Sequence, residues 1–142
     1  MKKLLCAILL LASALFFAVQ ARAQAPVLVI ANPGVNAAAI SKNDLRDVFT
    51  GAATSLKDGS HVDPILLKTG SIHQQFLASY LDKSDAAFHA GWRSLVFSGQ
   101  GSMPRTLESE AAVVDFVAHN PGAIGYISQG TAHEGVKVLA IK

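Results

Sequence analysis

The sequence predicts a three-layer α/β sandwich with a mixed, largely parallel sheet. Two observations support this fold class. Apolar runs rich in β-branched residues alternate with amphipathic helical segments, and clusters of Gly, Pro and Asn separate them. We expect strands at residues 25–30, 62–67, 123–127 and 136–141, and helices that begin at Ser41, Ser71, Ser84 and Ser109.

Each helix is predicted from its start signal and its apolar spacing. Ser41 is the expected N-cap of the first helix, Asp44 stands in capping-box position, and Gly51 ends the helix. Pro64 favours an early or edge position in the second strand. The inward faces are expected to hold Leu45, Val48 and Phe49; Ile72, Phe76, Tyr80 and Leu81; Phe88, Trp92, Leu95 and Val96; and Val113, Phe116 and Val117.

The first 23 residues are predicted to be a cleaved secretory signal peptide. Two lysines precede an apolar run at residues 4–19, and residues 21–23 (Ala-Arg-Ala) fit a cleavage site. A membrane anchor is the alternative, but this run is shorter than the ~20 residues that span a bilayer. We therefore expect one domain over residues 24–142, located in the periplasm.

Charge and cysteine content bound the function classes. Removing the predicted signal peptide leaves 9 Lys and Arg against 10 Asp and Glu residues, so the formal charge falls from +2 to −1. This balance does not indicate nucleic acid or a membrane surface as a partner. The single cysteine, Cys6, lies in the signal peptide, so the domain is expected to rely on its apolar core and not on disulfides.

The strongest candidate site is the junction of the second strand with the second helix. There the strand ends in residues 68–71 (Lys-Thr-Gly-Ser), and a helical pattern begins at once. The first N–H groups of a helix lack internal partners, and the helix dipole favours an anion beside them. Gly70 would let the backbone approach a ligand closely, and the hydroxyls of Thr69 and Ser71 could donate to an oxyanion.

Neighbouring residues extend this candidate site. The N–H groups of Ile72 and His73 would point toward the same anion, and Lys68 or the His73 side chain would add positive charge. The alternative is structural, because Ser71 and Gln74 also have the spacing of a capping box. The local sequence leaves both interpretations open.

Two further features could hold an anion. Residues 99–102 (Gly-Gln-Gly-Ser) could present consecutive N–H groups, although they match neither a P-loop nor a dinucleotide fingerprint, and a plain loop is the alternative. Arginines can bind phosphate through two hydrogen bonds. Of Arg46, Arg93 and Arg105, we favour Arg105 because it follows the Gly-rich loop.

The sequence gives no support for metal binding or catalysis. Its five histidines lack metal-site spacing and have no cysteine partner in the mature domain. No GxSxG segment is present, and nothing places a nucleophile beside a base. We therefore expect no metal, no other cofactor and no enzymatic activity.

Several segments together resemble the phosphate-type periplasmic solute-binding proteins of ABC transporters. Residues 117–127 are close to that family's Val-x-x-x-Pro-Gly-Ala-Ile-Gly-Tyr-Val segment. Other similar segments, in the same order, are the Asn-Pro strand end at residues 30–33, the Leu-Ser-x-x-x-Leu-x-x-Ile-Phe-x-Gly helix at 40–51, the Asp-Gly turn at 57–59, the strand and helix at 67–76, and the Gly-x-Gly loop at 99–101.

This resemblance implies one of the two α/β lobes that close on a dehydrated phosphate in that family. It places the role of the family's Ser-Gly-Thr turn on Thr69, Gly70, Ser71 and Ile72. The chain departs from the pattern, because Lys68 replaces an arginine and Ser-Gly-Thr appears as Gly-Ser-Ile. The family's N-terminal phosphate loop has no counterpart, so about half of a full binding protein is expected to be missing.

Two functions follow from the sequence. The first is non-catalytic binding of phosphate or a similar oxyanion by Thr69, Gly70, Ser71, Ile72 and His73, assisted by Arg105. An ABC permease would be the partner, and a second copy of the chain in a homodimer could supply the missing wall. The alternative is an interaction or sensory module that docks on an envelope partner without tight ligand binding.

Overall fold

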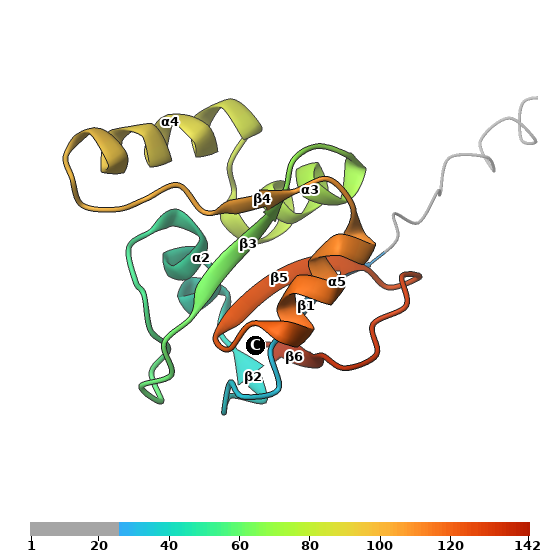
Figure 1. Ribbon diagram of the computed structural model, residues 1–142. Helices are drawn as coiled ribbons and strands as arrows, with labels where there is room; N and C mark the ends of the chain where they lie inside the picture. Colours follow the sequence, from blue (N-terminus) through green and yellow to red (C-terminus); the bar gives the residue numbers. More distant parts are fainter. Residues whose placement is uncertain (1–25) are drawn as a thin grey trace, which may run out of the picture.

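The computed structural model describes residues 26–142, so the predicted signal peptide and Cys6 lie outside the described residues (Figure 1). The strands are β1 (Val27–Ala31), β2 (Ala39–Ile40), β3 (Asp63–Leu67), β4 (Arg105–Leu107), β5 (Ala123–Ser128) and β6 (Lys137–Ile141). The helices are α2 (Lys42–Thr50), α3 (Ser71–Phe76), α4 (Asp85–Phe97) and α5 (Glu110–His119), and a π-helical turn η2 (Leu77–Leu81) continues α3.

The six strands form one mixed sheet in the order β2-β6-β1-β5-β3-β4. Strand β1 runs antiparallel to both of its neighbours, β5 and β6. The other pairs, β2 with β6, β3 with β4 and β3 with β5, are parallel. Five strands therefore run in one direction and β1 runs against them, which confirms the predicted mixed, largely parallel sheet.

Helices cover both faces of this sheet. Helix α5 lies on one face, against β5, β3 and β1, while α2 and α3 lie on the other and α4 packs outside α2 (Figure 1). Gly125 in β5 explains how closely α5 approaches, because a Cβ there would lie 2.8 Å from Val113 Cγ1. The next residue, Tyr126, is fully buried and stacks on Phe76 of α3 with ring centroids 3.9 Å apart.

Most predicted helix boundaries are confirmed. Ser41, Ser84 and Ser109 are N-caps whose hydroxyl groups accept a hydrogen bond from the N–H three residues later. Gly51 ends α2 with φ at 82°. The buried face of α2 consists of Leu45, Val48 and Phe49, as predicted.

Three predicted faces are wrong in part, including that of α5, where Phe116 is only half-buried. His73, Phe76, Leu77 and Leu81 are the buried residues of α3 and η2, whereas Ile72 and Tyr80 are only half-buried. The π-helical turn shifts the helical spacing there. Val96 is 43% exposed because α4 packs mainly through Phe88 and Trp92.

Strands β2 and β4 were not predicted, since they have only two and three residues. Because β4 pairs with β3 on the side away from β5, Pro64 lies in an interior strand and not in an edge strand. Proline is tolerated there because it lies early in β3, before the pairing with β4 begins at Ile65.

Candidate anion site at the carboxyl edge of the sheet

Parallel strands bring the predicted turn to one edge of the sheet. Strands β3, β4 and β5 are parallel neighbours, so their carboxyl ends meet. The Lys68 N–H donates to the Leu107 carbonyl at 2.9 Å, which holds the end of β3 beside the end of β4. The following residues, Thr69, Gly70 and Ser71, are all exposed at this edge.

The start of α3 differs from the starts of the other helices that the structure describes. Its N-cap is Gly70, with φ at 115° and no side-chain capping bond, whereas α2, α4 and α5 each have a serine cap. Within residues 26–142, the N–H groups of Ser71, Ile72 and His73 have no protein acceptor. Three donors at a helix start are therefore left to solvent or a ligand.

The capping-box interpretation of this turn is wrong. Ser71 is the first residue of α3 and not its N-cap, so its hydroxyl is not placed to cap the helix. The Gln74 N–H donates to the Gly70 carbonyl at 3.1 Å as an ordinary helical bond. Glycine at the cap is required by its positive φ, which side chains rarely adopt.

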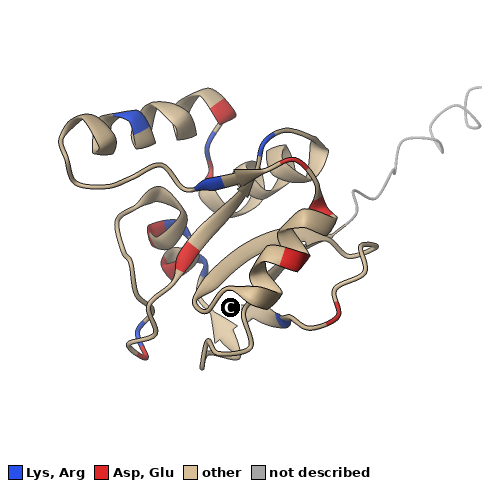
Figure 2. Ribbon diagram, in the orientation of Figure 1, with Lys and Arg blue, Asp and Glu red and all other residues tan. Residues whose placement is uncertain are grey.

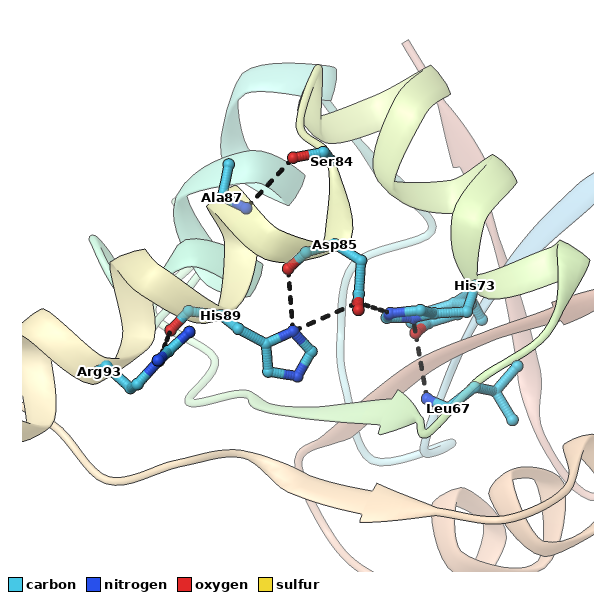
Figure 3. A network of polar contacts seen from close by, with 8 residues as sticks. Leu67, His73, Ser84, Asp85, Ala87, His89 and Arg93 are labelled. Atoms are coloured by element: carbon cyan, nitrogen blue, oxygen red, sulfur yellow. Dashed lines mark hydrogen bonds and ion pairs between the residues drawn. The ribbon is translucent and has the colours of Figure 1, made fainter.

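The imidazole of His73 points into the protein and not toward the exposed turn (Figure 3). Its ring is buried, with Nδ1 2.5 Å from the Tyr126 hydroxyl and Nε2 2.7 Å from Asp85 Oδ1. The Tyr126 hydroxyl in turn accepts the Leu67 N–H at 3.0 Å. An anion at the turn could therefore meet the backbone N–H of His73, but not its ring.

Tyr126 is a neutral phenol in this network. Burial raises the pKa of Tyr126, and the Asp85 carboxylate adds to the rise, outweighing the opposing effect of the Leu67 N–H. The phenol therefore keeps its proton, and the His73 ring links this hydroxyl to the Asp85 carboxylate. This network fixes the first turn of α3 against β5 and the start of α4.

Charge at this edge is balanced and not strongly positive. Lys68 Nζ lies 3.0 Å from Glu108 Oε1, so the positive charge of Lys68 is already paired. Glu110, at the start of α5, accepts hydrogen bonds from the Ser128 N–H and the Thr131 hydroxyl. Figure 2 shows acidic and basic positions interspersed along the ribbon.

Arg105 lies away from the turn. It begins β4 in register with Ile65 of β3, and Ile65 precedes Gly70 by five residues in the chain. The Cζ atom of Arg105 lies 4.9 Å from the centre of the Phe116 ring. The structure thus brings together residues 69–73 of the predicted site but does not bring Arg105 to them. Arg46 is also occupied elsewhere, with Nη2 2.9 Å from Asp82 Oδ2.

The Gly-rich loop after α4 is a helix terminator. The N–H groups of Gly99 and Gln100 donate to the carbonyls of Val96 and Leu95, at 3.1 and 3.0 Å. Gly99 has φ at 74°, as expected for a residue just past a helix end. These N–H groups satisfy the last carbonyls of α4, which supports the plain-loop interpretation for the first two residues of the segment.

Sequence reasoning missed the partners of His73 and Lys68. Tyr126, Asp85 and Glu108 come from segments 12 to 53 residues distant in the chain, and no local pattern relates them.

Across residues 26–142, no group of three or more His, Cys, Asp or Glu side chains is arranged to hold a metal ion. In the same residues, no helix has both the length and the apolar character needed to cross a membrane.

Comparison with solved structures identifies the fold. The sequence itself matches no protein-family model and no curated protein. The structure is similar to an ABC-type phosphate transport receptor from Vibrio cholerae (TM-score 0.62, 14% identity), covering 82% of this chain and 46% of that one. It is also similar to PstS from Borrelia burgdorferi (TM-score 0.62, 17% identity), covering 83% and 47%.

A third similar structure was solved with phosphate bound. This protein from Clostridium perfringens, described as a phosphate ABC transporter substrate-binding protein, has a TM-score of 0.63 and 14% identity. The match covers 82% of this chain and 45% of that one. The chain therefore has the fold of part of a phosphate ABC transporter substrate-binding protein, and it spans less than half the length of these similar structures.

Proposed function

We propose that this protein is an exported, non-catalytic binding protein for phosphate or a similar oxyanion. The observation that carries the proposal is the uncapped start of α3, where the N–H groups of Ser71, Ile72 and His73 have no acceptor in residues 26–142. Thr69 and Ser71, exposed residues of the same turn, carry hydroxyl groups that can also donate. No atom lies within 4 Å of the position that a Cβ at Gly70 would take, so the backbone there is open to close approach. The similar structures are named for phosphate binding or transport, which supports the same ligand class.

The exposure of the turn sets the expected affinity. Charge-assisted hydrogen bonds contribute about 1.5–3 kcal/mol each when water is excluded. Here the anion would keep part of its hydration, and Lys68 is paired with Glu108. Since ~1.4 kcal/mol is tenfold in affinity, the loss of several donors weakens binding by orders of magnitude. We expect weak binding to this chain alone, and tighter binding where a second copy or an envelope partner covers the turn.

Calorimetric titration of the mature protein with phosphate, sulfate and molybdate tests the proposal. Ser71→Ala removes the hydroxyl alone, whereas Ser71→Pro also removes the N–H and is tolerated at the first position of a helix. Binding should weaken in Ser71→Ala and weaken further in Ser71→Pro. The absence of heat at millimolar anion for the unmodified protein would contradict the proposal.

An interaction module is the second candidate, favoured by a separate observation. Phe97, at the end of α4, is 91% exposed, and Val96 and Met103 in the same segment are more than 40% exposed. Exposed apolar residues of this kind are typical of docking surfaces. In this version an envelope sensor or an ABC permease binds segment 96–103. Capture of one stoichiometric partner from periplasmic extract, lost in Phe97→Ser, would support it, and capture of none would count against it.

A further inference from the structure

A cavity of about 470 Å³ lies at the opposite end of the strands from the candidate anion site. Small-molecule sites typically enclose about 300–1,000 Å³. The cavity is bounded by the end of α2, the start of β3, Trp92 of α4, the Gly-rich loop and α5. Its apolar wall includes Val48, Pro64, Trp92, Met103 and Phe116. No residue of the turn at 68–73 lines it, so this cavity is distinct from the proposed anion site.

Arg105 supplies the positive charge of the cavity wall. Its guanidinium group lies over the ring of Phe116, with Cζ 4.9 Å from the ring centre. A cation–π contact holds the planar group in place without using its N–H donors. In the described part of the chain, no carboxylate lies within ion-pairing distance of Arg105. The N–H donors of the guanidinium group are therefore free to bind one carboxylate through two parallel hydrogen bonds.

A negative charge on the same wall restricts which anion fits. Asp63 lines the cavity and lies 3.3 Å from His61 Nε2. Its carboxylate repels a ligand that carries two negative charges, such as phosphate near neutral pH, more strongly than a ligand that carries one. The rest of the wall is mainly apolar, which suits an apolar body and not a hydrated ion.

We propose that this cavity binds a small monocarboxylate with an apolar body. The carboxylate binds the guanidinium group of Arg105, and the apolar body packs between Trp92 and Met103. This site is independent of the oxyanion proposed at the start of α3.

Trp92 reports directly on occupancy because it is the only tryptophan of the chain and lines the cavity. The test is a titration of the mature protein with 4-phenylbutyrate, followed by calorimetry and by Trp92 emission. We expect saturable binding at micromolar to millimolar probe. Arg105→Gln should weaken this binding at least tenfold, whereas Arg93→Gln, which changes an exposed arginine outside the cavity, should leave it unchanged.

Two further arms separate charge from shape. The uncharged 4-phenylbutanol should bind at least tenfold more weakly than the carboxylate. Gly101→Leu should abolish binding, because the leucine side chain would occupy the cavity. The backbone should accept this change, because a Cβ at Gly101 would lie at ordinary contact, 3.6 Å from Trp92 Cζ3, and the φ of Gly101 is not positive. The absence of both heat and an emission change in the unmodified protein would overturn the proposal. Equal affinity for the alcohol and the carboxylate, or an unchanged affinity in Arg105→Gln, would overturn it as well.

Discussion

Removing the Tyr126 hydroxyl measures how much the buried hydrogen-bond network behind the candidate site contributes to stability. In Tyr126→Phe, the Leu67 N–H loses its acceptor at 3.0 Å, and His73 Nδ1 loses its partner at 2.5 Å. Both groups are buried, so water does not readily replace the hydroxyl. Each unsatisfied group costs about 1–3 kcal/mol, so the loss of both should lower the free energy of unfolding by about 2–6 kcal/mol. The ring itself stays, and its packing on Phe76 is retained.

Tyr80→Phe is the matched control for this experiment. Tyr80 is half-buried, and its hydroxyl makes no hydrogen bond within residues 26–142, so its removal should cost less than about 0.5 kcal/mol. Urea unfolding curves of the three proteins, followed by circular dichroism, give the comparison. A loss in Tyr126→Phe no larger than in Tyr80→Phe would refute the role assigned to the network.

Three other changes have expected outcomes that the same unfolding assay can check. Gly51→Ala should cost about 2–5 kcal/mol, because φ is 82° and the new Cβ would lie 2.6 Å from Leu95 Cδ1, whereas Gly59→Ala, with φ at 86° in open space, should cost about 1–2 kcal/mol. Asn32→Ala should cost about 1–3 kcal/mol because it removes the Asn32 Nδ2 hydrogen bonds to the last carbonyls of α5, at 2.9 and 3.2 Å. Burial alone would raise the pKa of Glu110, but hydrogen bonds from Ser128 and Thr131 outweigh it and hold that pKa below 4.5. The stability this adds is present above pH 4.5 and lost as the pH falls through the folded-state pKa, so the difference from Glu110→Gln should shrink in acid.

Local patterns were sufficient to predict most of the fold. Serine caps at Ser41, Ser84 and Ser109 and the stop at Gly51 depend on residues within one helical turn, and they are where the sequence places them. The inward face after Ser71 was harder, because the π-helical turn alters the spacing that the prediction assumes. Strands β2 and β4 are too short to show a period and form only through their neighbours.

The sequence predicted the backbone of the candidate site but not the contacts of its side chains. The turn at 69–71 and the start of α3 depend on local sequence, and Gly70 indicates them. The orientation of the side chains depends on partners that are distant in the chain. The His73 ring contacts Tyr126 and Asp85, and Lys68 forms an ion pair with Glu108. Arg105 was placed by its nearness to the Gly-rich loop, whereas the parallel register of β4 with β3 sets its position five residues from the turn.

The most direct measurement is an amide chemical-shift titration of ¹⁵N-labelled protein, residues 24–142, with phosphate. If the start of α3 binds the anion, the largest saturable shifts will be those of the Ser71, Ile72 and His73 amides, since these are the unpaired donors. The amides of Gly99 and Gln100 should move little, because they are bonded to the end of α4. Saturable shifts centred away from residues 69–73, or no saturable shifts at millimolar phosphate, would contradict the proposed function.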